Sequence, residues 1–416
     1  MTSKGIMIVT LLLALMISAT TSSPTSQDVK DVYSHIFNGY DKRVRPVWNQ
    51  SDVVSVTLSF KLNSINEFDE KSQKLVLSGW FDASWSDESQ TWNMSDFGDV
   101  PHVYVDGNSI WLPQIALANT FGRVNILSQL ASSAAISANG EVEWFPGDSF
   151  VVTCEVDITY YPFDTQHCSL VFEIWDAPTS EVILQTSSEP VDVNFFEENG
   201  EWTLTKVEVG IPKIDDEVSS ITYLLHLQRR PKFVVLTTIA PVLLLAFLNV
   251  CVFLIPLSSG EKNSFCVTVY LSYAVFLGTI SSELPHNSKN ASYLTIYLLT
   301  LLVFSVTIFL VTVIQVRLFI EYGDTPVPAS VAKMFGYCTL GNRSKVKYSD
   351  KKDPDDVKDN RVQALIEDPE LKQTNENRFC VKDLLPRLDV PLFCLFLAIL
   401  CVITFVMGDL AFSRSL

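Results

Sequence analysis

Hydroxyl, apolar and small side chains repeat along residues 264–282 with the spacing of one helix face. Steps of 4, 3, 4, 3 and 4 residues connect Ser264, Thr268, Leu271, Val275, Gly278 and Ser282, so on an α-helix these side chains form a single stripe. Hydroxyl oxygens can replace part of an ion's hydration shell, and a ring of apolar side chains can close a passage by excluding water. Several copies of this stripe around one axis would form a gated ion pathway, with Leu271 and Val275 as its constriction.

Glu261 lies just before this stripe, in the segment SSGEK. A ring of carboxylates at the mouth of a pore favours cations, so Glu261 predicts cation selectivity and completes the set of pore-lining candidates. The alternative is that the hydroxyls pack helices together and that Glu261 and Lys262 only cap a loop. A single helix encloses no channel, so the pore interpretation requires an oligomer.

Catalytic chemistry is not indicated. The sequence contains no nucleophile elbow, phosphate-binding glycine loop or zinc motif, and its five histidines show no spacing typical of metal ligands. We therefore predict no catalytic residues, no metal and no cofactor, and we expect that the chain is not an enzyme. Its formal charge of −17 also argues against nucleic acid as a partner.

The elements before residue 231 predict a secreted β domain. Residues 1–23 have a basic start, an apolar run and small polar residues, which is typical of a signal peptide, with an uncleaved anchor as the alternative. Residues 24–230 alternate short apolar and aromatic runs with turn residues, which predicts an extracellular all-β sandwich of the immunoglobulin-like kind. This domain holds 12 Lys and Arg against 31 Asp and Glu. The acidic excess fits either a solvated surface or a field that concentrates cations.

Four apolar runs after Pro231 predict a transmembrane bundle. They cover residues 233–255, 265–282, 293–316 and 391–411, and a helix of about 20 residues crosses the hydrocarbon of a bilayer. The expected order is helices one to three within 231–317, a partly disordered cytoplasmic loop at 318–390, the fourth helix at 391–411 and a short extracellular tail at 412–416. Lysines cluster in the loop, as the positive-inside tendency expects.

Two covalent features follow from this topology. Of the eight cysteines, only Cys154 and Cys168 fall in the extracellular domain, where disulfides form. We therefore expect them to pair and to close a loop of thirteen residues. Asn49 and Asn93 begin Asn-X-Ser sequons in the same domain and are candidate glycosylation sites.

These features together resemble a subunit of a Cys-loop receptor, a pentameric ligand-gated ion channel, of the nicotinic acetylcholine receptor-like branch. The resemblance rests on the disulfide loop with its YPFD tip, the β domain, the four spans and the hydroxyl-lined second span. Finer matches follow the family order over most of residues 30–320 and in the last helix. They include DEKSQ (69–73), SWSDESQTWN (84–93), WLPQIALAN (111–119), GEW (200–202), ITY (221–223), QRRP (228–231), SSGEK (258–262) and AVFLGTISSELP (274–285).

The resemblance implies five subunits around a central axis, with a ligand site at each interface between extracellular domains. Trp175 matches the aromatic residue of the principal face, and Trp85 matches the tryptophan that the neighbouring subunit contributes. The faces of such rings hold an organic cation with about 0.5–2 kcal/mol per contact. Ala118, followed by Asn119, stands where the family has a binding tyrosine. For either tryptophan alone, ordinary core packing is the alternative.

Two departures from the family pattern concern the ligand. Ala118 replaces an aromatic residue, and residues 205–219 contain neither an aromatic residue nor a cysteine. In the family this hairpin carries tyrosines and, in acetylcholine-binding subunits, adjacent cysteines. Three options follow for this subunit: it binds another small molecule, it serves as the complementary face of a mixed pentamer, or it does not respond to ordinary transmitters.

The disulfide loop is expected to couple the extracellular domain to the spans. Its tip is Tyr161-Pro162-Phe163, and an exposed apolar tip is unfavourable in water. We therefore expect the tip to rest against the outer ends of the spans and the linker that begins near Pro285.

An ion pair is expected beside this loop. The resemblance implies that Asp69 and Glu70, in a neighbouring loop between strands, pair with Arg229 just before the first span. Breaking a partly buried carboxylate–arginine pair from one side costs about 3–5 kcal/mol. Changes at this pair should therefore impair opening more than assembly.

The sequence as a whole predicts a subunit of a homo- or heteropentameric, cation-selective, ligand-gated ion channel of the plasma membrane. Small-molecule binding at subunit interfaces would open a pore lined by residues 264–282. The expected partners are identical or related subunits, a small ligand for which an organic cation is one option, permeant cations and membrane lipid, but no nucleic acid. The alternative is a non-conducting or accessory membrane-anchored binding subunit of the same fold, which the bulky Tyr270 and Tyr273 of the second span favour.

Overall fold

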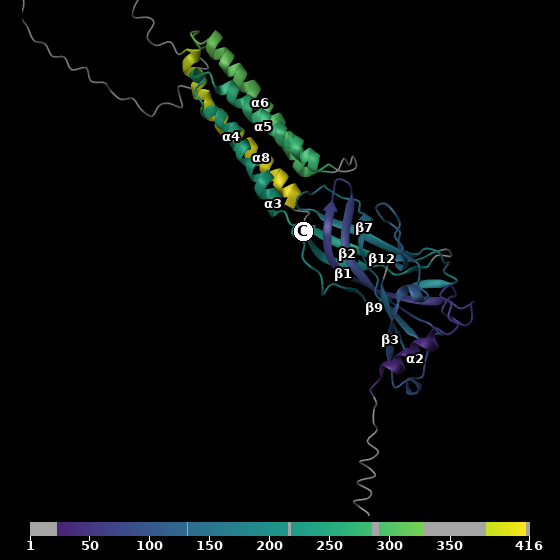
Figure 1. Ribbon diagram of the computed structural model, residues 1–416. Coiled ribbons are helices and arrows are strands. Elements are labelled where there is room, and N and C mark those ends of the chain that lie inside the picture. The colour runs from purple at the N-terminus through teal and green to yellow at the C-terminus, as the bar shows by residue number, and fades with distance from the viewer. Residues whose placement is uncertain (1–22, 131, 215–217, 285–290, 328–379, 413–416) are drawn as a thin grey trace, which may run out of the picture. The chain divides into compact units, whose positions relative to one another are not determined.

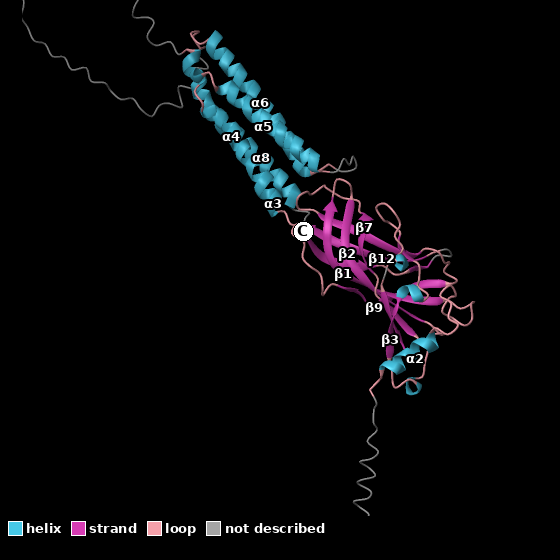
Figure 2. Cartoon of the chain, in the orientation of Figure 1, coloured by secondary structure: helices cyan, strands magenta, loops and turns pink. Residues whose placement is uncertain are grey.

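The computed structural model describes residues 23–130, 132–214, 218–284, 291–327 and 380–412. The first of its two units runs to Pro231 and the second begins at Lys232. Figure 2 shows the strands in the first unit and the long helices in the second. The predicted leader up to residue 22, Pro285, most of the predicted cytoplasmic loop and the tail from residue 413 lie outside the described residues.

Among the described residues, seven strands form one sheet of the first unit (Figure 1). Its order is β3 (His102–Asp106), β5 (Ser133–Ser137), β6 (Glu141–Trp144), β2 (Lys74–Ser86), β1 (Val54–Asp69) and β9 (Val182–Asp192), and β7 (Gly147–Thr153) also pairs with β2. All pairings are antiparallel except that of β1 with β9. Buried and partly exposed residues alternate along β2, as expected of a sheet with one covered face.

A second sheet contains five strands in the same part of the described chain. Its order is β10 (Trp202–Val209), β12 (Ser219–Arg229), β8 (Thr165–Ile174) and β4 (Ile115–Leu117), and β11 (Lys213–Ile214) pairs with the start of β12. The antiparallel pairing of β12 with β8 runs from the Ser220–Glu173 pair to the Gln228–Thr165 pair. This long register fixes which side chains of the two strands face each other.

The two sheets pack face to face through aromatic rings. Phe60, Phe81 and Phe150 come from the first sheet, and Phe172 and Tyr223 come from the second. The ring centroids of Phe81 and Phe172 lie 4.7 Å apart, and those of Phe60 and Tyr223 lie 5.4 Å apart. All five rings are buried. The predicted β-sandwich is therefore confirmed, with its core between the sheets.

Short helical elements complete the first unit. Thr25 and Asp28 form a capping box at the start of α2 (Ser26–Ile36). The Tyr33 hydroxyl of α2 donates a hydrogen bond to the Tyr104 carbonyl of β3 (2.6 Å), so the helix is tied to the edge strand of the sheet. Single 3-10 turns lie at Met94–Asp96 (η1), Gly107–Ser109 (η2) and Leu127–Gln129 (η3).

Within the described residues, the second unit contains four helices that are long and apolar enough to cross a membrane. The first covers Lys232–Leu254 and consists of α3 (Lys232–Val234), the π-helical η4 (Val235–Ile239), α4 (Ala240–Val250) and the 3-10 turn η5 (Cys251–Leu254). The others are α5 (Lys262–Glu283), which the turn η6 (Leu257–Ser259) precedes, α6 (Tyr293–Glu321) and α8 (Val381–Phe412). The predicted four-helix membrane region is confirmed.

The last two helices extend beyond their predicted ends. α6 continues past residue 317, and α8 starts at Val381 rather than at residue 391, so that Pro386 and Pro391 lie inside it. The predicted start followed the apolar run alone, whereas the helix also includes the more polar residues before it. The N–H of Val381 donates to the Thr325 carbonyl (3.2 Å), so the early start of α8 is held by the turn that follows α6.

Aromatic and hydroxyl contacts connect the helices of the second unit. The ring of Phe396 in α8 lies 5.2 Å from that of Phe253 in η5 and 5.6 Å from that of Phe304 in α6, between centroids. The hydroxyls of Tyr297 in α6 and Thr404 in α8 are 3.1 Å apart. These contacts make the first, third and fourth spans one packed group, to which α5 adds one of its faces.

Candidate functional site

α5 has one buried face and one exposed face. The buried side chains are Lys262, Cys266, Val269, Tyr273 and Ile280. All six residues of the predicted stripe at 264–282 are exposed, and Leu271 and Val275 are each 61% exposed. The helical spacing therefore selects the face of α5 that the chain's own helices leave uncovered.

Two of the three hydroxyl groups of this stripe bond to the backbone of their own helix. Thr268 donates to the Ser264 carbonyl (3.0 Å), and Ser282 donates to the Thr279 carbonyl (2.6 Å). Such bonds satisfy the hydroxyl hydrogen and leave oxygen lone pairs for water or an ion. Because Thr268 and Ser282 are exposed, they do not pack the helices of one chain together.

Two adjacent charged side chains at the start of α5 lie in different environments. Glu261 is exposed, whereas Lys262 is only 1% exposed. The Lys262 ammonium lies 2.7 Å from the Asp389 carboxylate of α8, to which the Gln315 amide of α6 also donates (3.1 Å). Gly260 turns the chain at a φ of +76°, which glycine adopts without strain. The cation is thus neutralised inside the bundle, and the carboxylate of Glu261 stays at the surface.

Arg229, at the end of β12, is the centre of an ionic cluster. Its guanidinium lies 2.6 Å from the Glu70 carboxylate and 2.7 Å from the Asp164 carboxylate, with a second bond to Asp164 at 3.2 Å. The predicted pairing of Glu70 with Arg229 is therefore present. Asp69, which was predicted beside it, instead accepts hydrogen bonds from the backbone N–H and hydroxyl of Ser72. Asp69 ends β1 and is engaged by the turn that follows it, so of the two carboxylates only that of Glu70 reaches Arg229.

This cluster is shielded from water. The side chains of Arg229 and Asp164 are 9% and 2% exposed, and the guanidinium carbon lies 4.2 Å from the Trp202 ring centroid and 4.9 Å from that of Tyr161. Burial alone would lower the pKa of Arg229, but the hydrogen bonds and charges of Asp164 and then Glu70 hold that pKa above its usual value. The pair therefore stays charged, and removing one partner would leave a buried charge uncompensated.

A disulfide joins Cys154 and Cys168, which is the pairing expected from the sequence. At the tip of the loop that it closes, Pro162 is buried, and Tyr161 and Phe163 are partly buried. The tip is therefore not the fully exposed apolar surface that its sequence alone suggests. The expected contact of this tip with the spans stays a prediction.

Trp85 lies in the core rather than at the surface. It is 3% exposed, and its ring lies 5.7 Å from that of Trp111 and 6.4 Å from that of Trp144, between centroids. The expectation that Trp85 offers its face to a ligand is therefore wrong, because the odd-numbered residues of β2 point inward. Trp80 is on the outward side of the same strand, with its ring 5.6 Å from that of Phe195.

The other three predicted ligand residues differ in their exposure and in the contacts that their side chains make. Trp175 follows β8 directly, is 50% exposed, and is fixed by a bond from its N–H to the Gln114 carbonyl (2.8 Å). Ala118 is exposed but has no polar or aromatic group. The Asn119 amide donates to one backbone carbonyl of β8 (2.7 Å) and accepts from one N–H of that strand (3.0 Å). Asn119 therefore connects strands, and its predicted role as a ligand contact is not supported by this geometry.

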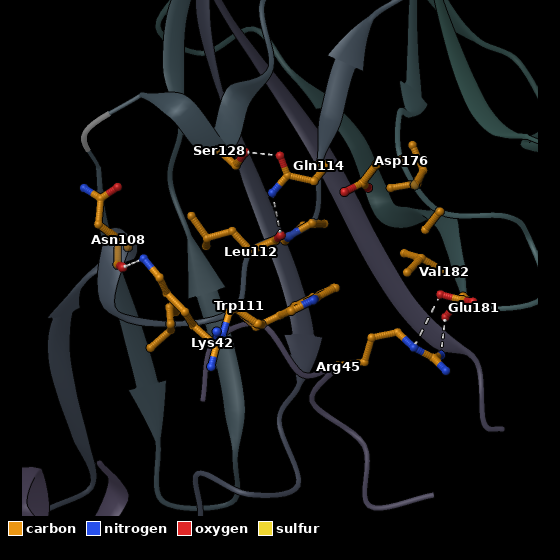
Figure 3. Close-up of a pocket in the computed structure, with 16 residues that line it drawn as sticks. Lys42, Arg45, Asn108, Trp111, Leu112, Gln114, Ser128, Asp176, Glu181 and Val182 are labelled. Carbon is orange, nitrogen blue, oxygen red and sulfur yellow. Dashed lines mark hydrogen bonds and ion pairs between the residues drawn. The ribbon is translucent and has the colours of Figure 1, made fainter. Parts of the chain in front are cut away.

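A cavity of about 370 Å³ lies beside the chain neighbours of Trp175. Figure 3 shows its lining, which includes Lys42, Asn108, Gln114, Ser128, Asp176, Glu181 and Arg45. The Lys42 ammonium donates to the Asn108 carbonyl (2.7 Å), and Arg45 Nε lies 3.6 Å from the Glu181 carboxylate. Burial raises the pKa of Asp176. One ion pair, between Arg45 and Glu181, thus lies within a lining that carries several charged side chains, which makes this a polar cavity rather than an aromatic one.

The two sequon asparagines are at the surface. The Asn49 amide donates to the Asp52 carboxylate (2.9 Å), and the Asn93 amide donates to that of Asp96 (3.3 Å). Both residues are exposed, as glycan attachment requires. Their modification stays a prediction.

The sequence also matches known proteins along both units. Residues 29–231 match the profile of the neurotransmitter-gated ion-channel ligand binding domain, and residues 238–379 match that of the neurotransmitter-gated ion-channel transmembrane region. The neuronal acetylcholine receptor subunit beta-3 of Homo sapiens is 34% identical over 336 residues, which cover 79% of this chain and 73% of that protein. The chain belongs to the neurotransmitter-gated ion channel family.

Other neurotransmitter-gated ion channel subunits are similar over a shorter part. The neuronal acetylcholine receptor subunit beta-3 of Gallus gallus is 35% identical over 287 residues, which are 68% of this chain and 63% of that protein. The neuronal acetylcholine receptor subunit alpha-2 of Gallus gallus is 32% identical over 287 residues, which are 68% of this chain and 54% of that protein. These similarities confirm the nicotinic receptor-like branch that the sequence motifs indicate.

Membership in the neurotransmitter-gated ion channel family settles the class of the protein. It is a membrane receptor subunit with an extracellular ligand-binding domain and four transmembrane helices, and it is not an enzyme. Subunits of nicotinic receptors form pentamers with other subunits and bind small-molecule agonists.

Reasoning from the sequence did not identify three residues that make notable contacts in this channel subunit: Asp164, Asp389 and Trp80. In the sequence, Asp164 appears only as the last residue of the YPFD tip, although its carboxylate makes two of the bonds to Arg229. Asp389 pairs with Lys262 over a separation of 127 residues, which no local spacing reveals. Trp80 could have been found by counting the alternation of β2 outward from Phe81, which is buried.

Proposed function

We propose that this chain is a subunit of a pentameric, cation-selective, ligand-gated ion channel in which the exposed face of α5 lines the pore. The observation that carries this proposal is the division of α5 into a face packed against its own bundle and a stripe at 264–282 that remains uncovered. An uncovered stripe of hydroxyl, small and aliphatic side chains fits a water-filled axis shared by several subunits. Its largest apolar members, Leu271 and Val275, form the constriction.

Cation selectivity is proposed from the charges at the start of α5. Glu261 is exposed, and five copies of it around one axis would form a ring of negative charge. The adjacent Lys262 would oppose that ring if it were also exposed. Its ion pair with Asp389 (2.7 Å) removes this opposition, so the carboxylate dominates the field at that end of the helix.

The ligand is proposed to bind at the interface between extracellular domains, with Trp175 on one side. Half of the Trp175 side chain is exposed, so its ring face is available to an organic cation. Trp80, with Phe195 beside it, is proposed in the role that the sequence assigned to Trp85, because only Trp80 faces outward. Ala118 contributes no ring, so the aromatic enclosure is smaller than one with a tyrosine there.

Gating is proposed to pass through the ionic cluster of Arg229, Asp164 and Glu70. Arg229 stands three residues before Lys232, where the first span begins, so a displacement of the β8–β12 strand ends is carried by the backbone into that span. A ligand that binds one arrangement of the interface more tightly shifts the closed–open equilibrium by no more than its differential affinity. The proposed cluster is stiff enough for this task because it is buried and bonded on three sides.

Cysteine labelling tests the pore proposal without requiring an agonist. Val275→Cys and Ser282→Cys should react with a membrane-impermeant, water-soluble thiol reagent in assembled receptors, and a bulky permeant cation should protect Ser282→Cys. Val303→Cys, on an exposed face of α6, is the matched control and should react poorly because lipid covers it. Wild type corrects for the native exposed Cys394 and Cys401. Equal labelling at 275 and 303 would overturn the proposed pore face.

A second candidate is an accessory subunit that assembles but does not conduct alone. The exposed Ala118 and the partly exposed Tyr270 beside the stripe favour it, whereas Tyr273 does not, because it is buried in the bundle. Recording currents from the chain expressed alone, with a panel of small cationic and neutral ligands, separates the two candidates. The accessory role would be favoured if the chain expressed alone gives no current but alters the currents of a co-expressed related subunit.

A further inference from the structure

Lys42 is a cation of the polar cavity beside Trp175 that keeps hydrogen-bond donors free. Its ammonium donates to the Asn108 carbonyl (2.7 Å) and forms no ion pair with any described residue. An ammonium group carries three donors, so two remain for a bound molecule. The other cations of the lining are occupied, because Arg43 pairs with the carboxylate two residues before it (2.6 Å) and Arg45 donates to three backbone carbonyls.

Asp176 is the carboxylate of this cavity that lacks a cation. Among the described residues no other side chain donates to it, whereas the Glu181 carboxylate has the Arg45 guanidinium at 3.6 Å. Burial raises the pKa of Asp176, and the negative charge of Glu181 raises it further. A carboxylate that is partly removed from water and faces a second negative charge is unfavourable. A positively charged group in the cavity would therefore stabilise Asp176.

These two charges lie at opposite ends of the cavity. In Figure 3, Lys42 lies beside Asn108 at one end and Asp176 lies at the other, with Trp111 and Leu112 between them. The volume of about 370 Å³ falls in the range of small-molecule sites. The cavity thus has a positive end, a middle that offers apolar side chains and a negative end.

We propose that this cavity binds a small zwitterion whose carboxylate bonds to Lys42 and whose ammonium bonds to Asp176, with a short aliphatic chain in between. An α-amino acid, whose two charged groups flank one carbon atom, should satisfy only one end. The bound molecule would supply each charge with the partner that the chain itself does not provide, in charge-assisted hydrogen bonds. The site lies within one subunit and goes beyond the proposed channel function.

The position of the cavity connects it to the proposed ligand contact Trp175. Asp176 follows Trp175 directly, and the Trp175 N–H donates to the Gln114 carbonyl (2.8 Å). The Gln114 amide oxygen accepts a hydrogen bond from Ser128 (2.7 Å), and both side chains line the cavity. A zwitterion that draws on Asp176 therefore acts on the same backbone that positions the Trp175 ring.

A consequence, which rests on the proposed role of Trp175, is regulation of the interface ligand. Occupation of the cavity should change the affinity for that ligand, and the ligand should change the affinity for the zwitterion by the same factor. The binding of the zwitterion itself requires neither an agonist nor an open channel. Failure of the binding test would therefore leave the proposed channel function untouched.

The test titrates the full chain, purified in detergent, with unbranched ω-amino acids of increasing chain length in a calorimeter. One intermediate length should bind most tightly and should raise the melting temperature by a few degrees, since a ligand of the native state stabilises it. The amine and the carboxylic acid of the same chain length should each bind at least about tenfold more weakly, because one charged contact is lost. No binding by any member of the series, or equal affinity for the amine alone, would overturn the proposal.

Matched variants place the binding in this cavity. Lys42→Gln and Asp176→Asn should each weaken binding of the best ω-amino acid by at least about tenfold. Arg43→Gln removes the adjacent cation, which is already paired, and should leave the affinity unchanged. Ligand-free melting temperatures of all variants check the fold. Affinity retained in both Lys42→Gln and Asp176→Asn, or lost equally in Arg43→Gln, would contradict the assigned contacts.

Discussion

The Lys262 ammonium and the Asp389 carboxylate form an ion pair of 2.7 Å between the start of α5 and the early part of α8. Their side chains are 1% and 9% exposed, and the Phe253 ring centroid lies 5.5 Å from the ammonium. Gln315 supplies a further hydrogen bond to the same carboxylate. The proposed pore helix is thus fixed at one end to the last helix of its own chain.

Removing one partner of this pair should impair assembly. Asp389→Asn leaves the Lys262 ammonium buried without a counter-charge, at a cost of about 3–5 kcal/mol. We expect a severalfold loss of receptor at the cell surface, measured by surface labelling against total protein. The double variant Lys262→Met with Asp389→Leu removes both charges and should recover most of the surface receptor. The same loss in the single and double variants would argue against the ion pair as the cause.

A polar residue at the proposed constriction should make the pore conduct more easily. Leu271→Thr replaces an exposed isobutyl group by a hydroxyl and favours wetting of the passage. We expect a standing current, or activation at lower ligand concentration, in whole-cell recordings. Val303→Thr makes a comparable change on an exposed part of α6 and should leave the current unchanged. A silent Leu271→Thr channel with normal surface abundance would count against this gate.

The Arg229 cluster should matter more for opening than for assembly, and its two carboxylates should differ. Asp164→Asn removes the partner that makes two bonds and is 2% exposed, whereas Glu70→Ala removes one bond from a side chain that is 22% exposed. We expect a larger loss of current per surface receptor for Asp164→Asn and Arg229→Gln than for Glu70→Ala. The recordings can use the standing current of a Leu271→Thr background.

Asp69→Asn is the control for these three changes. Asp69 bonds within its own turn, to Ser72, and lies next to Glu70 in the chain. Its substitution should reduce current by much less than Asp164→Asn does. Equal effects of Asp69→Asn and Asp164→Asn would show that the loops, rather than the cluster, determine the loss.

The two tryptophans of β2 should respond in opposite ways to truncation. Trp85→Ala empties a core position between Trp111 and Trp144 and should cost about 3–5 kcal/mol of stability, seen as a lower melting temperature and less surface receptor. Trp80→Ala should preserve both and weaken ligand binding, as should Trp175→Ala. Normal stability of Trp85→Ala would contradict its assignment to the core.

The elements whose side chains repeat at a regular period were predictable from the sequence. The stripe of α5 was found because a helix repeats every 3.6 residues, so side chains spaced by 3 and 4 residues lie on one face. In the same way, the alternation of apolar and polar residues along the strands predicted the β-sandwich. The prediction failed for Trp85 because the assignment followed a motif instead of the strand's own alternation, which places Trp85 on the same side as the buried Phe81 and Ala83.

The pairings that hold the candidate sites could not be predicted in this way. Asp164 and Arg229 are 65 residues apart, and Lys262 and Asp389 are 127 apart, so only the folded chain brings their charges together. The resemblance suggested a carboxylate for Arg229 but named two neighbours, and only Glu70 reaches it, because Asp69 bonds to Ser72 in its own turn. His167 lies in the disulfide loop and His226 lies just before QRRP, and only the register of β8 with β12 pairs them.

The indole of Trp202, which is 1% exposed and lies 4.2 Å from the Arg229 guanidinium, gives the protein a built-in optical reporter. Its emission should depend on whether that cation is in place, because the ring senses the charge above its face. The difference spectrum between the parent protein and Trp202→Phe would isolate this signal from the other indoles. Movements of the ionic cluster could then be followed in real time without attaching a dye.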